Sequence, residues 1–167
     1  MKKLFSALCA IALTAWVGGL WSVGYLAVPV VFHAQPDKQL AGMLAGEMLN
    51  AVGYLGLVCG GMLLLGEICT VSCGHTRKIW QEKTFWIIAA MLVFGLIIQF
   101  GLSPVMADLK VQARPLDVML SPFADRFKML HGVSSVLYLL ESLLGLYLVT
   151  RSTTPKRIGV NQNLSDC

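Results

Sequence analysis

The chain contains four apolar stretches that are each too long for the core of a small water-soluble domain. The first runs over residues 4–32 without a charged side chain and is apolar on every face. The others lie within residues 41–73, 85–106 and 129–150. About 20 apolar residues are enough for a helix to cross the hydrocarbon core of a bilayer. We therefore predict an all-α integral membrane protein built as a four-helix bundle.

Composition supports a single membrane domain. Only 13% of the 167 residues are charged, against about 25% in soluble domains. We expect a four-span transmembrane domain over residues 1–150 and a polar C-terminal tail over residues 151–167. No basic patch with interleaved aromatic residues is present, so nucleic acid is not expected as a partner. The expected partners are the lipid bilayer and either a second copy of the chain or another membrane protein.

The first two apolar stretches have features that constrain their helices. The first begins like a signal peptide, but its apolar run exceeds the usual 7–15 residues or so, which favours an uncleaved helix. Pro29 should bend that helix near its end, because proline removes one backbone hydrogen bond and crowds the carbonyl of Tyr25. A helix over residues 41–73 would be about 50 Å long. It should therefore tilt, break near Gly60 and Gly61, or begin as an interfacial segment.

The placement of basic residues predicts the orientation. One side carries eight of the 13 basic residues, which are Lys2, Lys3, Arg77, Lys78, Lys83, Arg151, Lys156 and Arg157. The other side carries Lys38, Lys110, Arg114, Arg126 and Lys128. Because the richer side is usually cytoplasmic, we expect an inner-membrane protein with both termini in the cytoplasm. Residues 107–128 on the outer side mix apolar and charged side chains, which is typical of an interfacial lid.

A few polar residues inside the apolar stretches are the candidate site. A carboxylate in the middle of a span costs roughly 2.5–3.5 kcal/mol on the insertion scale, so it should face the bundle interior or stay protonated. The candidates for a solute or ion pathway are Glu47, Asn50, Gln99, His131, Ser135, Tyr138 and Glu141. We expect Glu47, Asn50, Gln99, His131 and Glu141 to converge in one pocket under residues 107–128, where Arg114, Arg126 or Lys128 could supply a counter-charge to Glu47. The alternative interpretation is that these groups are hydrogen-bonding contacts between helices, without a transport role.

Two metal-binding interpretations are weaker. His33 and His131 both lie near the outer surface, so they could hold a haem between them, although no haem motif surrounds either. Cys69 and Cys73, with Glu67 and His75 nearby, could bind copper(I) or zinc, but small buried thiols are the better explanation of this spacing. No cofactor or metal site is therefore predicted. No nucleophile elbow, phosphate loop or zinc-protease helix is present, and an enzyme is not expected.

Several segments together resemble a known family. They are WVGGLWSVGYLAVPVVF, LAGMLAGEMLNAVGYLGLVCG, FGLSPVMADLK and FKMLHGVSSVLYLLESLLGLYLV. In their order and spacing they resemble the bacterial membrane family called domain of unknown function 4149, which is related to animal transmembrane protein 205. The resemblance implies a four-helix membrane protein without an established biochemical activity. The animal relatives are linked to platinum-drug resistance, which implies transport or trafficking but assigns no catalytic residue.

The function expected from these observations is the passing or sensing of a small solute or metal ion. A looser likeness, through the Trp-x-Gly-Gly start, links the chain to copper-resistance and haem-related four-helix membrane proteins. Those proteins usually place histidines inside their spans, whereas His33 and His131 lie at span ends here. A haem- or copper-binding redox module, or a structural subunit of a larger membrane complex, are the alternatives.

Overall fold

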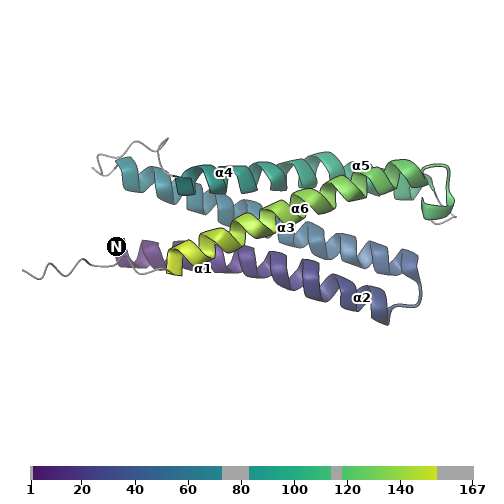
Figure 1. Ribbon diagram of the computed structural model, residues 1–167, viewed down its shortest axis with the longest axis horizontal. Helices are drawn as coiled ribbons and strands as arrows, with labels where there is room; N and C mark the ends of the chain where they lie inside the picture. The colour runs from purple at the N-terminus through teal and green to yellow at the C-terminus, as the bar shows by residue number, and fades with distance from the viewer. Residues whose placement is uncertain (1, 73–82, 114–117, 154–167) are drawn as a thin grey trace, which may run out of the picture.

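Four long helical passes run back and forth in the computed structural model, which describes residues 2–72, 83–113 and 118–153 (Figure 1). No strand occurs among these residues. The elements in chain order are α1 (Lys2–Ser22), the π-helical turn η1 (Val23–Ala27), α2 (Val28–Ala34), α3 (Lys38–Ser72), α4 (Lys83–Leu96), the π-helical turn η3 (Ile97–Leu102), α5 (Ser103–Gln112), the 3₁₀ turn η4 (Val118–Leu120) and α6 (Ala124–Thr153).

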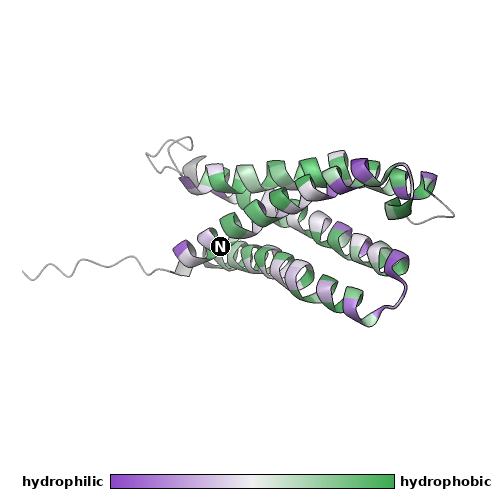
Figure 2. Cartoon of the chain, turned by 45° about the vertical axis from the view of Figure 1, so that its right-hand side comes forward, coloured by the Kyte–Doolittle hydropathy of each residue, from purple (hydrophilic) through white to green (hydrophobic). Residues whose placement is uncertain are grey.

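Each pass is long and apolar enough to cross a membrane. The four candidate spans are Ala7–Ala34, Lys38–Ile68, Lys83–Gln112 and Ala124–Arg151. Figure 2 shows hydrophobic residues along all four passes, with hydrophilic residues concentrated towards their ends. The chain is a multi-pass α-helical membrane protein, as the apolar stretches predict.

The four passes place both chain ends together. Lys2 and Thr153 lie at one end of the bundle, which we call the terminal end (Figure 1). The 35–37 turn and η4 lie at the opposite end, which we call the turn end. Helix α6 begins beside α5 and ends beside α1, so it crosses the bundle diagonally (Figure 1). The first and last passes are therefore close only over part of their lengths.

Helix α3 corrects one expectation about the second apolar stretch. It continues without interruption from Lys38 to Ser72, through Gly60 and Gly61. Of the three alternatives for this stretch, a break at these glycines is therefore wrong. Glycine weakens a helix by only about 1 kcal/mol, and here Gly60 is buried beneath side chains of two neighbouring helices. Close packing therefore outweighs the low helix propensity at this point.

The segment over residues 107–128 is also different from the expected interfacial lid. Its first part completes α5, and its last part, from Ala124, begins α6. Between them a small apolar cluster closes the turn end, and its buried members are Leu109, Ala113, Val118 and Phe127. Val118, Phe123 and Phe127 of this segment thus pack into one cluster, whereas Met119 and Leu120 are exposed. Both passes extend beyond their predicted ends.

Both prolines inside the passes follow a π-helical turn. Pro29 lies two residues after η1, and Pro104 lies two residues after η3. The turn before Pro29 shifts the backbone ladder, since the Val28 N–H donates to the carbonyl of Val23. A proline cannot donate to the carbonyl four residues earlier, and a wider turn accommodates that loss. The helix is therefore irregular just before Pro29, in the form of a π-turn, and it continues to Ala34. The bend at Pro29 stays a prediction.

Part of the predicted organisation lies outside the described residues. Most of the inner connection, at 73–82, and the part of the polar tail beyond Thr153 belong to this group. Cys73, His75 and Arg114 fall there as well.

Candidate functional site

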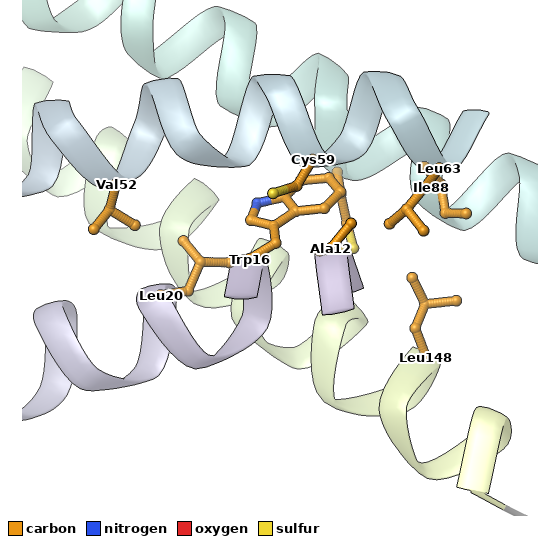
Figure 3. Close-up of a cluster of buried hydrophobic side chains, with 9 residues drawn as sticks. Ala12, Trp16, Leu20, Val52, Cys59, Leu63, Ile88 and Leu148 are labelled. Carbon is orange, nitrogen blue, oxygen red and sulfur yellow. The ribbon is translucent and has the colours of Figure 1, made fainter. Parts of the chain in front are cut away.

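Trp16 occupies the centre of the bundle. Its side chain is only 1% exposed and lies in a buried cluster with Ala12, Leu20, Cys59 and apolar residues of the other passes (Figure 3). The indole fits against two glycines of α3, because a Cβ added at Gly60 would lie 2.7 Å from the ring, and one at Gly56 would also collide with it. The absence of side chains at these two positions makes room for the largest side chain of the core.

The indole of Trp16 also binds the most deeply placed carboxyl group. Its Nε1 donates a hydrogen bond of 3.2 Å to Oε1 of Glu141. Glu141 lies near the middle of α6, is 4% exposed, and has no basic partner within the described part of the chain. Its Oε1 lies 3.8 Å from where a Cβ would stand at Gly95 of α4. The carboxyl group is thus enclosed between α1, α4 and α6.

Two further hydrogen bonds join the first and last passes beside this pair. The Tyr138 hydroxyl donates to the carbonyl of Leu20 at 2.7 Å, and Trp21 Nε1 donates to the carbonyl of Ser142 at 3.4 Å. The Tyr138 ring lies against Gly24, where a Cβ would approach within 2.8 Å of the ring. Three hydrogen bonds therefore join residues 16–21 of α1 to residues 138–142 of α6.

A second buried polar pair links the middle two passes. Gln99 of η3 is 6% exposed, and its Nε2 donates to Oδ1 of Asn50 in α3. Its carbonyl oxygen lies against Gly53. Because a buried amide without a partner costs about 1–3 kcal/mol, the pair satisfies two side chains that would otherwise be costly in the membrane.

The two pairs lie about one helical turn apart and form what we call the buried polar layer, made of Trp16, Asn50, Gln99 and Glu141. On α3 the glycines that receive Gln99 and Trp16 are three residues apart, and on the third pass Gly95 precedes Gln99 by four residues. Such spacings place residues on one helix face. All four passes contribute one residue each to the layer.

The predicted convergence of polar residues is therefore partial. Gln99 and Glu141 point inward, and Asn50 joins them, as expected. Glu47, His131 and Ser135 are exposed and stay outside the layer. The Ser135 hydroxyl bonds the carbonyl of His131 in its own helix. Glu47 and His131 therefore do not share one pocket with Gln99 and Glu141 under residues 107–128.

Sequence reasoning did not place Trp16, Gly56 and Gly60 among the candidate site residues, because an indole in an apolar run has no pattern that reveals its partner. Only the antiparallel pairing of α1 with α3 brings it against Gly56 and Gly60, and only the diagonal course of α6 brings Glu141 to its Nε1.

At the turn end the cationic side chains have local roles. Lys110 donates to the carbonyl of Gly42 at 3.2 Å and lies 5.6 Å from the centre of the Phe127 ring. Lys128 forms an ion pair of 3.8 Å with Asp125 in its own helix. Within the described residues no ion pair to Glu47 is present, so neither Arg126 nor Lys128 supplies the predicted counter-charge, and Arg114 lies outside the described residues.

The histidines and cysteines do not gather. His33 near the end of α2 is exposed, and His131 is exposed and stacks on Phe127 with ring centres 6.0 Å apart. No group of three His, Cys, Asp or Glu residues that could hold a metal occurs within residues 2–72, 83–113 and 118–153. The Cys69 and Cys73 interpretation rests on side chains that lie outside what the structure describes.

Comparison with known proteins gives a family. Residues 11–115 match the family described as domain of unknown function (DUF4149). The chain belongs to this family. The matched region covers Trp16, Asn50 and Gln99, whereas Glu141 on α6 lies beyond it. Neither the curated proteins nor the solved structures include a significant match to the chain.

Membership in this family sets no chemistry for the layer, because the family description assigns no activity. The site must therefore be interpreted from its own groups. It offers one carboxyl group, two carboxamides that bind each other and one indole donor. These groups can hold a proton or a small polar species, and they contain no nucleophile arranged with a base.

Proposed function

We propose that this protein is a non-enzymatic inner-membrane protein that passes or senses a small solute or ion through its buried polar layer. The observation that carries the proposal is Glu141, which is 4% exposed near the middle of a membrane-spanning helix and is bonded to Trp16 alone among the described residues. Ionisable residues inside membrane spans are costly and commonly mark ion paths and proton relays. A carboxyl group needed only for packing would be replaced at lower cost by an apolar residue.

The test of this function is the substitution Glu141→Gln. A glutamine Oε1 can still accept the Trp16 hydrogen bond, so the fold should persist, while the group can no longer exchange a proton. We expect solute uptake by cells carrying Glu141→Gln to match that of deletion cells and to differ severalfold from wild type. The comparison uses a panel of small solutes and metal ions, with protein amount in the membrane measured by immunoblot.

A matched control separates charge from burial in that experiment. Glu47→Gln removes an exposed carboxylate from α3 and should leave uptake at the wild-type level. If both variants behave like wild type, the layer is a contact between helices, and the structural-subunit alternative is then favoured. Four glycines support that alternative, because no neighbouring atom lies within 4 Å of their Cβ positions; they are Gly18, Gly61, Gly101 and Gly132. Such small residues leave room for another helix to pack closely.

We also propose that the terminal end faces the cytoplasm. The support is the distribution of basic residues, because eight of the 13 fall in the N-terminal, 73–84 and C-terminal segments that belong to the terminal end. The side richer in lysine and arginine is usually cytoplasmic. A reporter enzyme fused after Cys167 that is active only in the cytoplasm should be active, and one that is active only in the periplasm should be inactive. The reverse pattern would show the opposite orientation.

A further inference from the structure

We propose that Glu141 binds a proton rather than a metal cation, and that the proton reaches it from the turn end alone. This proposal rests on the proposed function, because it specifies what the buried polar layer takes up. It makes the layer a sensor of the pH on one side of the membrane. The argument depends on the groups that surround Glu141 and on how polar groups are distributed along α6.

The groups around Glu141 do not form a cation shell. One of its oxygens accepts the Trp16 N–H, and a donor at that position repels a cation. The nearest carboxamides, Asn50 and Gln99, are bonded to each other. Mg²⁺ and Ca²⁺ need about six or more oxygen ligands, whereas one available carboxyl group is enough to hold a proton.

Among the residues that the structure describes, no group of opposite charge lies beside Glu141. The titratable groups that face it from the elements around it are Tyr138 on its own helix, Tyr25 of η1, whose ring lies 6.2 Å from that of Tyr138, and Cys59 of α3 beside Trp16. Helix α4 presents Gly95 and apolar side chains. None of these groups is cationic. An isolated carboxylate in an apolar interior is costly, so the group neutralises itself, and a proton is the simplest way to do so.

On the face of α6 that carries Glu141, polar side chains continue towards the turn end, whereas Leu144, Gly145 and Leu148 follow towards the terminal end. Towards the turn end, the face of the helix carries Tyr138, Ser135 and His131 at spacings of three and four residues, and the last two are exposed. Hydroxyl and imidazole groups arranged in this way can pass a proton directly or through bound water.

Towards the terminal end the way is closed by apolar side chains. After Ser142 the helix carries no side-chain hydroxyl until Tyr147, and Tyr147 is exposed on the surface. The interior there is filled by the buried cluster that includes Ala12, Leu63, Ile88, Met91 and Leu148 (Figure 3). An interior lined by such residues stays dry. Within the described residues, polar groups therefore lead a proton between Glu141 and the turn end, and the apolar cluster separates Glu141 from the terminal end.

The experiment uses the emission of Trp16 as a reporter of Glu141. The full chain with Trp21→Phe, Trp80→Phe and Trp86→Phe retains Trp16 as its only tryptophan, and it is reconstituted in vesicles in both orientations. A tag after Cys167 marks the terminal end, so the fraction of tag protected from added protease equals the fraction of molecules with the turn end outside. The outer medium is then acidified rapidly, and a protonophore is added afterwards.

We expect a fast change of Trp16 emission, and its share of the total amplitude should equal the protease-protected fraction of the tag. The rest of the amplitude should appear only after the protonophore is added. Glu141→Gln should abolish both phases. Ser135→Ala should slow the fast phase severalfold, whereas Thr14→Ala, which removes an exposed hydroxyl from α1, should not. Adding Na⁺, Mg²⁺ or Zn²⁺ at constant pH should leave the emission unchanged.

Three results would overturn the proposal. They are a full fast phase without protonophore, a fast phase that follows the accessible tag fraction, and a cation response at constant pH that Glu141→Gln removes. The absence of any pH response in the wild-type background would overturn it as well. Because this readout needs no solute, failure of the uptake experiment with an intact emission response would refute solute passage and leave proton binding established.

Discussion

Gly60→Leu should lower the free energy of unfolding of the purified protein by about 3 kcal/mol. A Cβ at Gly60 would lie 2.6 Å from Cδ2 of Leu92 and 2.7 Å from the ring of Trp16, and a leucine adds three more carbon atoms in the same direction. The Trp16 ring is 1% exposed, so it cannot retreat without displacing α1 from α3. The measurement is reversible unfolding in mixed micelles, followed by circular dichroism.

The adjacent residue supplies the matched control. Gly61 has no atom within 4 Å of its Cβ position, although it differs from Gly60 by only one place in the same helix. Gly61→Leu should therefore change the unfolding free energy by less than about 0.5 kcal/mol, or raise it slightly through improved helix propensity. Equal losses of unfolding free energy for both variants would show that the contact of Trp16 with Gly56 and Gly60 does not hold the first pass in place.

Trp16→Ala is the second change with a large expected effect. It empties the centre of the bundle and removes the hydrogen-bond donor to Glu141. Truncation of a buried tryptophan costs about 3–5 kcal/mol in soluble proteins. We expect about 3 kcal/mol here, because lipid competes for apolar surface and reduces the transfer part of that cost. The same unfolding measurement in micelles applies.

Trp21 provides the comparison for this prediction. It is 39% exposed, and its bond to the Ser142 carbonyl is long at 3.4 Å. Trp21→Ala should cost less than about 1 kcal/mol, in line with the average for hydrogen bonds between membrane helices. If Trp21→Ala lowered the unfolding free energy as much as Trp16→Ala, the central role of the contact between Trp16 and the α3 glycines would be contradicted.

The helices themselves could be predicted because lipid imposes a simple requirement. Every backbone polar group in the hydrocarbon core must be paired, so an uncharged run such as residues 4–32 has to be helical. That rule gave the approximate position of all four passes. The cost of exposing polar groups to lipid gave the inward direction of Gln99 and Glu141. The rule concerns each segment alone, so sequence was sufficient.

The ends and the irregular turns were less accessible to this reasoning. Residues 107–128 have a composition that suits an interface, yet their apolar members find one another across the chain and form the cluster around Leu109 and Phe127. The π-turn before Pro104 has the same origin as that before Pro29, but only the latter was anticipated as an irregularity. Composition describes what a segment tolerates, and contacts between distant segments decide which conformation it adopts.

The sequence by itself therefore determined that the chain crosses a membrane four times as helices and that its interior must pair a few polar groups. Only the tertiary structure decided which groups meet, because partner choice depends on the rotation and crossing of whole helices. Trp16 lies 125 residues before Glu141, and no periodicity links them. Their contact exists because glycines on α3 let the indole sink into the bundle and because α6 crosses to the first pass at that depth.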